Sequence, residues 1–176
     1  MIDYLPFQKM NIRVTTSRDD SDLAFFYDLL LYGEFLTKTI SLFLVASIYD
    51  DKERIKYRQE HHLVRASAIG DFSKAINEVV LGPAAQLLNP ELRDNEQKEL
   101  TQRASGDEWQ YKAQKLLIEC LDHFNIEHDP LPVKSPLRNW FEFFTFLRNK
   151  TRGHGATRLE PCSKVCPKLE QSIKLI

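Results

Sequence analysis

The sequence has few glycines and almost no strand-like alternation. Only 6 of its 176 residues are glycine, whereas sheet-rich proteins with many tight turns depend on glycine at those turns. Alternation of apolar and polar residues is confined to Asn11–Thr15, and apolar side chains elsewhere recur at spacings of three and four, which is typical of helices. The sequence therefore predicts an all-α fold.

Cysteine is scarce, and no secretion signal is recognisable. The three cysteines, Cys120, Cys162 and Cys166, are odd in number, and no charged segment followed by an apolar one begins at Met1. Neither a disulfide scaffold nor secretion is indicated, so we expect a cytoplasmic protein. Cys162, Cys166 and His154 could supply three metal ligands, but no fourth is apparent. We expect no metal and no cofactor.

The chain also lacks an excess of one charge and a membrane-length apolar run. Its 24 basic and 25 acidic side chains nearly cancel, so any affinity for phosphate must come from a local cluster. The longest apolar run, from Thr39 to Tyr49, is about half of the roughly 20 residues that cross a bilayer. We interpret it as part of a core helix and expect no membrane partner.

The length of 176 residues suits a single domain. We predict a bundle of about five to seven helices, among them a long one from Leu23 to Tyr49 that begins after acidic residues and an N-cap. Further helices are expected over residues 51–68, 71–81, 108–124 and from 136 onward. The polar segment 87–107, with a helix starting at Asn89-Pro90, is expected to be an insertion. The apolar end Ile173–Ile176 suggests the front part of a longer protein.

The helix that begins at Ser135-Pro136 carries an unusually wide apolar arc. At about 100° per residue the arc covers roughly 220°, and its members are Leu137, Trp140, Phe141, Phe143, Phe144, Phe146 and Leu147. Such a helix either lies at the centre of its own bundle or buries its extra face against a second copy of the chain. The sequence leaves both arrangements open.

This aromatic helix ends in the most informative segment, Arg148-Asn149-Lys150-Thr151-Arg152-Gly153-His154-Gly155. Arg148 falls on the apolar arc, so its guanidinium needs a carboxylate or a phosphate as acceptor. The alternative is a C-terminal charge that interacts with the helix macrodipole. The glycines around His154 allow a turn that brings its imidazole back toward Arg148. A guanidinium and an imidazole together suit metal-independent RNA cleavage.

A second candidate group lies on the long helix. Glu34 belongs to a stripe formed by Leu23, Tyr27, Leu30, Val45 and Ile48, where a carboxylate is costly unless it is paired. Lys38, one turn later, is one possible partner, and Arg148 is the other. The remaining histidines, His61, His62, His123 and His128, are expected to be solvated.

The aromatic helix followed by Arg148, Asn149 and His154 resembles the signature of the HEPN superfamily, in which four to six residues separate an arginine from a histidine and the arginine is often followed directly by asparagine. The resemblance implies a dimerising helical bundle and, in many members, a metal-independent ribonuclease. His154 would then exchange protons with the ribose 2′-hydroxyl or the leaving oxygen, Arg148 would stabilise phosphate charge, and Asn149 would orient either group. Some members also use an acid from an earlier helix, as Glu34 would be here.

Two functions follow from this resemblance. The first is an endoribonuclease acting as a toxin or effector in prokaryotic defence, with Lys150 and Arg152 along the RNA backbone and with an antitoxin or a fused sensor domain as its regulator. The second is a non-catalytic HEPN-like module that binds a nucleotide or RNA, or that serves dimerisation. A shared fold alone does not establish activity.

Overall fold

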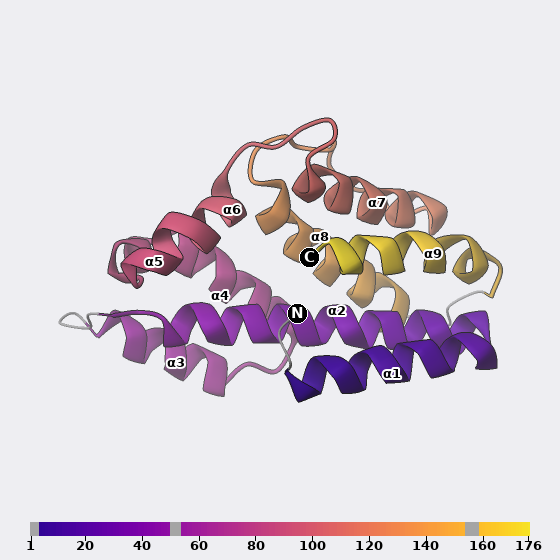
Figure 1. Ribbon diagram of the computed structural model, residues 1–176, viewed down its shortest axis with the longest axis horizontal. Helices are drawn as coiled ribbons and strands as arrows, with labels where there is room; N and C mark the ends of the chain where they lie inside the picture. Colours follow the sequence, from indigo (N-terminus) through magenta and orange to yellow (C-terminus); the bar gives the residue numbers. More distant parts are fainter. Residues whose placement is uncertain (1–3, 50–53, 154–158) are drawn as a thin grey trace.

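The computed structural model describes residues 4–49, 54–153 and 159–176, and it confirms the all-α prediction. Helix α2 (Asp22–Ala46) runs along the base of the molecule, with α1 (Leu5–Asp20) beside it (Figure 1). Helices α7 (Trp109–His123), α8 (Pro136–Arg148) and α9 (Leu159–Leu175) lie over one part of α2. Helices α3 (Ile55–Val64) and α4 (Ile69–Leu81) pack near its other end.

The long helix forms where the sequence predicts it and ends three residues earlier. The Ser21 hydroxyl accepts a hydrogen bond from the Ala24 N–H at 3.1 Å, and Asp22 occupies the first turn, so the helix has both an N-cap and a favourable charge at its N-terminus. The strand-like pattern Asn11–Thr15 lies inside α1 instead. Only Val14 and Ser17 of α1 are buried, which explains why periodicity did not reveal this helix.

Helix α4 shows how Asp71 acts as a cap. Its carboxylate accepts hydrogen bonds from the N–H groups of Ser67 and Ala68, at 2.9 and 3.0 Å. Asp71 therefore lies within the first turn, so the helix begins at Ile69, two residues before the predicted start. It ends at Leu81, as Gly82-Pro83 predicts.

The polar segment 87–107 is tied into the fold. After a 3₁₀ turn (Pro83–Leu87), it forms α5 (Pro90–Leu92), a π-helical turn (Arg93–Gln97) and α6 (Lys98–Thr101). Asn89 caps this stretch as predicted, because its side chain accepts a hydrogen bond from the Glu91 N–H at 3.0 Å. Leu92 and Leu100 are buried in the core, so the segment contributes apolar packing as well as a polar surface.

Helix α8 lies at the centre of the bundle. It packs against α2, α4, α6 and α7, and five members of its wide arc are buried: Leu137, Trp140, Phe141, Phe144 and Leu147. The indole of Trp140 also donates a hydrogen bond to the Ser172 hydroxyl of α9 at 2.7 Å. Phe143 and Phe146 are only partly buried. Most of the arc is therefore covered by the chain's own helices, which is the first of the two predicted arrangements.

The contact between α2 and α8 is close at one glycine. A Cβ atom added to Gly33 would lie within 3.0 Å of three ring atoms of Phe144. Phe144 is fully buried and stacks on Trp140, with ring centroids 5.1 Å apart. The absence of a side chain at position 33 thus lets the two helices meet next to Glu34.

Among the described residues, α2 is the one helix that is long and apolar enough to cross a membrane. Half of its most apolar 18-residue window is buried inside the protein. The buried side chains include Phe26, Leu29 and Leu30. The core helix of a soluble protein passes the same test of length and apolar composition. The run from Thr39 to Tyr49 belongs to this core helix as far as Ala46 and buries Leu44 and Val45 there, whereas Leu42, Phe43 and Tyr49 are exposed.

Candidate functional site

The predicted motif begins at the C-terminal end of α8. Arg148 is the last residue of that helix, and a π-helical turn (Asn149–Gly153) continues it by one turn. The π-turn ends at Gly153, close to the predicted stop near Arg152. His154, Gly155 and Ala156 lie outside the described residues. The structure therefore describes the arginine side of the motif, and the position of the imidazole stays a prediction.

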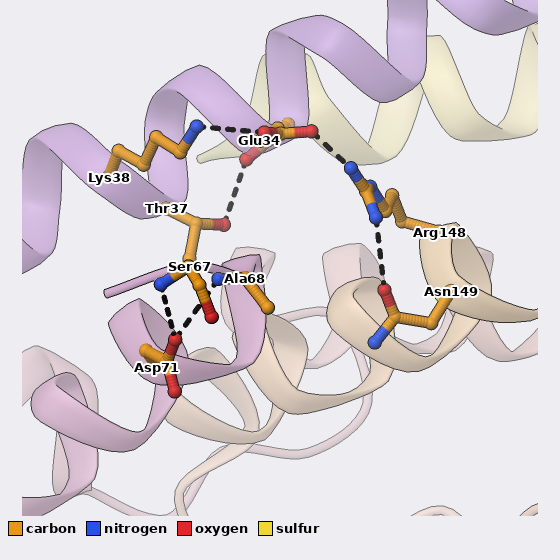
Figure 2. Close-up of polar contacts among 9 residues, drawn as sticks. Glu34, Thr37, Lys38, Ser67, Ala68, Asp71, Arg148 and Asn149 are labelled. Carbon is orange, nitrogen blue, oxygen red and sulfur yellow. Dashed lines mark hydrogen bonds and ion pairs between the residues drawn. The ribbon is translucent and has the colours of Figure 1, made fainter. Parts of the chain in front are cut away.

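Glu34 of α2 binds both of the cations considered for it (Figure 2). Lys38 Nζ donates to one carboxylate oxygen, Oε1, at 2.8 Å, and Arg148 Nε donates to the other, Oε2, at 3.3 Å. The two partners are thus not alternatives, because a carboxylate offers a separate oxygen to each. The Arg148 contact joins residues 114 positions apart in the chain.

The surroundings keep Glu34 ionised. Burial raises the pKa of its carboxyl, but the hydrogen bonds and positive charges of Lys38 and Arg148 outweigh burial and leave the pKa below its ordinary value. The Glu34 side chain is 13% exposed, whereas that of Lys38 is 42% exposed. Glu34 is therefore a fixed negative charge between α2 and α8. Its partner Arg148 is less exposed than its partner Lys38.

The Arg148 guanidinium is held in one orientation, but not all of its nitrogens make hydrogen bonds in the described part of the chain. Its side chain is 25% exposed, in agreement with the prediction that it is not freely solvated. Besides the Nε contact to Glu34, its Nη1 donates to Asn149 Oδ1 at 3.2 Å, so the guanidinium lies between these two side chains (Figure 2). Nη2 has no hydrogen bond with the described residues. One amino group of a fixed fork thus remains for an anion.

Lys150 and Arg152, the predicted RNA-binding residues, open onto two different cavities. Lys150 Nζ lies 5.4 Å from the ring centroid of Phe146 and lines a cavity of about 700 Å³. Arg152 is exposed and lines a cavity of about 340 Å³ next to α1 and α2. The structure thus brings Glu34, Lys38, Arg148 and Asn149 into one cluster and directs the next two basic side chains away from each other.

His128 is not solvated, which corrects the sequence-based interpretation. Its side chain is 15% exposed. Its Nδ1 lies 2.7 Å from the Asp129 carbonyl oxygen and its Nε2 lies 3.0 Å from Asp122 Oδ1. The backbone hydrogen bond to Asp129 is the main cause of a raised pKa, together with Asp122 and against the effect of burial. No sequence pattern marks this residue, because His128 and Asp129 lie in an irregular proline-rich connector that turns back to Asp122 at the end of α7. His61, His62 and His123 are exposed, as expected.

The cysteines of α9 are poorly suited to metal binding. Cys162 and Cys166 are buried thiols, and burial, as the main cause, raises the pKa of Cys166 to about 12. A cysteine binds metal as the thiolate, which this environment disfavours. Within the described ranges, no group of three or more histidine, cysteine or acidic side chains is arranged to hold a metal ion.

The site is thus a guanidinium held by a largely buried carboxylate at the end of the central helix, with Lys38 on the other carboxylate oxygen. Such a cluster can bind an anion and stabilise negative charge that develops on it. Comparison with known proteins adds no relative to this description: no family model, curated protein or solved structure matches the chain.

Proposed function

We propose that the protein is a metal-independent endoribonuclease of the HEPN type that cuts RNA by attack of the ribose 2′-hydroxyl on the adjacent phosphate. The proposal is supported by the motif Arg148-Asn149-x4-His154 and by the all-α fold, in which the motif follows the central aromatic helix. It extends to a role as a toxin or effector in prokaryotic defence, in the cytoplasm, with RNA as substrate.

The observation that carries the proposal is the fixed orientation of Arg148. Glu34 holds its Nε and Asn149 holds its Nη1, so binding of a phosphate would cost little further side-chain ordering. A donor that is oriented before the reaction stabilises developing charge better than a mobile one. Glu34 acts here as a positioning residue, since it contacts Arg148 and not the scissile phosphate.

The chemistry divides between two side chains. His154 would accept the proton of the 2′-hydroxyl or donate one to the leaving 5′-oxygen, and Arg148 would stabilise the charge on the phosphate as the bond to the 2′-oxygen forms. The products would be a 2′,3′-cyclic phosphate and a 5′-hydroxyl. DNA would resist cleavage because it lacks the nucleophile.

Partners of the proposed enzyme follow from the same reasoning. A second copy of the chain would bring two motifs to a shared cleft, as the resemblance implies, and an antitoxin or a fused sensor domain would keep the activity in check. Most of the aromatic arc is covered within one chain, so a dimer would have to use other surfaces, such as those around the half-buried Phe143 and Phe146.

One observation favours the second function, a non-catalytic HEPN-like module. Two of the three nitrogens of the Arg148 guanidinium already bind within the protein, which also suits a residue whose role is to join α2 to α8. In that case the cluster would bind an RNA or nucleotide phosphate without cleaving it, or would only stabilise the bundle.

RNA cleavage in the presence of EDTA tests the proposal. The parent protein, Arg148→Ala and His154→Ala are incubated with labelled RNA, alongside Arg18→Ala and His123→Ala, which remove an exposed arginine and an exposed histidine elsewhere. We expect the two motif variants to lose at least about 100-fold in rate and the two controls to cleave like the parent. Equal cleavage by motif variants and controls would refute the catalytic assignment, and binding without cleavage by the parent would favour the module.

A further inference from the structure

The cavity beside Arg152 has a composition suited to nucleic acid. It has a volume of about 340 Å³ and is lined by Arg13 of α1, by Tyr27, Asp28 and Leu31 of α2, and by Arg152. Cavities of roughly 300–1,000 Å³ accommodate small ligands. This one combines two guanidiniums, one aromatic ring and one carboxylate, so its lining carries a net positive charge in a protein whose overall charge is close to zero.

The carboxylate in this cavity is already neutralised by one arginine. Arg13 Nε donates to Asp28 Oδ1 at 2.8 Å, and the Asp28 side chain is only 13% exposed, against 58% for Arg13. The bond uses one of the five N–H donors of the guanidinium. The terminal amino groups of Arg13 have no hydrogen bond with the described residues, and neither does the side chain of Arg152. Both therefore remain available to a phosphate.

The cavity lies next to the Arg148 cluster along the same helix. Tyr27, Leu31, Glu34 and Lys38 are spaced by four, three and four residues, so they share one face of α2. Arg152 follows Arg148 by one turn. The two chain segments thus run past each other, with Arg148 at Glu34 and Arg152 near Leu31 and Tyr27.

From these contacts we infer that the cavity formed by Arg13, Tyr27 and Arg152 binds a nucleotide of the same single-stranded RNA whose phosphate is held by Arg148, a few nucleotides along the strand. This inference rests on the proposed function, which makes RNA the ligand and places its scissile phosphate at Arg148. Arg13 and Arg152 contact the phosphate, and the Tyr27 ring stacks on the base, the combination by which proteins bind single strands without reading sequence. Along α2, Tyr27 is roughly 10 Å from Glu34, about three steps of a stacked strand that advances roughly 3.4 Å per nucleotide.

Binding, rather than cleavage, tests this inference. The probe is a fluorescently labelled 2′-O-methyl oligonucleotide, which lacks the attacking hydroxyl and stays intact, and its affinity is measured by anisotropy at several salt concentrations. The variants are Arg13→Gln, Arg152→Gln, Tyr27→Leu and Tyr27→Phe. The matched control is Arg18→Gln, which removes the same charge from α1 at a residue that pairs with Glu170 of α9 instead.

Each variant has its own expected signature. Loss of one phosphate contact should lower the slope of log affinity against log salt concentration by about 0.7, so Arg13→Gln and Arg152→Gln should each show this change and Arg18→Gln should not. Tyr27→Leu should weaken binding by about 5- to 150-fold with an unchanged slope, since stacking on an aromatic ring involves no counterions. Tyr27→Phe keeps the ring and should bind like the parent.

The result that overturns the inference is equal binding and equal slope for Arg152→Gln and Arg18→Gln. Unchanged affinity for Tyr27→Leu would also overturn it, because the arginines would then act only as surface charge. Should Tyr27→Leu fail to fold, the slopes of the two arginine variants still decide the question. The outcome is separate from the cleavage test: the cavity can bind RNA in a protein that does not cleave it, and cleavage can depend on Arg148 and His154 when this cavity is unused.

Discussion

Replacing Gly33 by alanine should loosen the bundle at the candidate site. The added Cβ would lie within 3.0 Å of three ring atoms of Phe144, a separation that real Cβ contacts do not show. The ring cannot swing away, because it is fully buried and stacked on Trp140. Helices α2 and α8 would have to move apart at the residue next to Glu34, which would lengthen its contact with Arg148.

The magnitude follows from two opposing effects. Overpacking of a filled core costs about 1–3 kcal/mol, and the lack of space here places Gly33→Ala toward the upper end. Alanine is favoured over glycine within a helix by up to about 1 kcal/mol, which offsets part of that cost. We expect a net loss of about 2 kcal/mol in the free energy of unfolding, or a fall in Tm of about 4–8 °C for a chain of this length.

Urea denaturation followed by circular dichroism measures this change, with Gly70→Ala as the matched control. A Cβ at Gly70 would have Thr145 Cγ2 as its nearest neighbour at 3.9 Å, an ordinary contact. The control should therefore gain stability, by up to about 1 kcal/mol. The two identical substitutions should shift the midpoint in opposite directions. A Gly33→Ala protein as stable as the parent would refute the close approach of α2 and α8.

Three further outcomes follow from the polar contacts. Glu34→Gln should lower the free energy of unfolding by about 1 kcal/mol, given that its partners are partly exposed, whereas the exposed Glu60→Gln should change it little. The folded pKa of Glu34 lies below its ordinary value of 4.5. The difference in free energy of unfolding between the parent and Glu34→Gln should therefore be complete above that pH and should disappear as the pH falls through the folded pKa. A difference that persists in acid would contradict this origin. Asp71→Ala removes the acceptor for two N–H groups at the start of α4 and should cost about 1 kcal/mol by the same denaturation assay, and a neutral effect would show that the cap contributes nothing.

The helices that could be predicted are those whose apolar faces are buried. Apolar spacing and the caps at Ser21 and Asn89 place α2 and the segment from Pro90 close to their observed bounds. Helix α1 escapes such reasoning, because it buries little of its surface and presents no continuous apolar stripe. It is held instead by packing against α2 and by the pair between Arg13 and Asp28, which no local pattern encodes.

The candidate site was predictable in its chemistry and only partly in its geometry. A carboxylate on an apolar stripe requires a cation, which identified both Lys38 and Arg148 as partners of Glu34. The sequence could not show that both bind Glu34, since the Arg148 contact depends on how closely α2 approaches α8 at Gly33. The cavity at Arg13 and Tyr27 depends on contacts between distant segments, so it emerges only from the folded chain. The partners of His128 are close in sequence, but they are set by the path of the connector after α7, which no periodic pattern encodes.

The most direct test of the central claim is the chemical identity of the ends left on cleaved RNA. If Arg148 and His154 act on a shared phosphate, parent protein in EDTA should leave a 2′,3′-cyclic phosphate on one fragment and a 5′-hydroxyl on the other, and His154→Ala should leave the RNA intact. A 5′-phosphate on the products, or the same cyclic phosphate formed at the same rate by His154→Ala, would contradict the account.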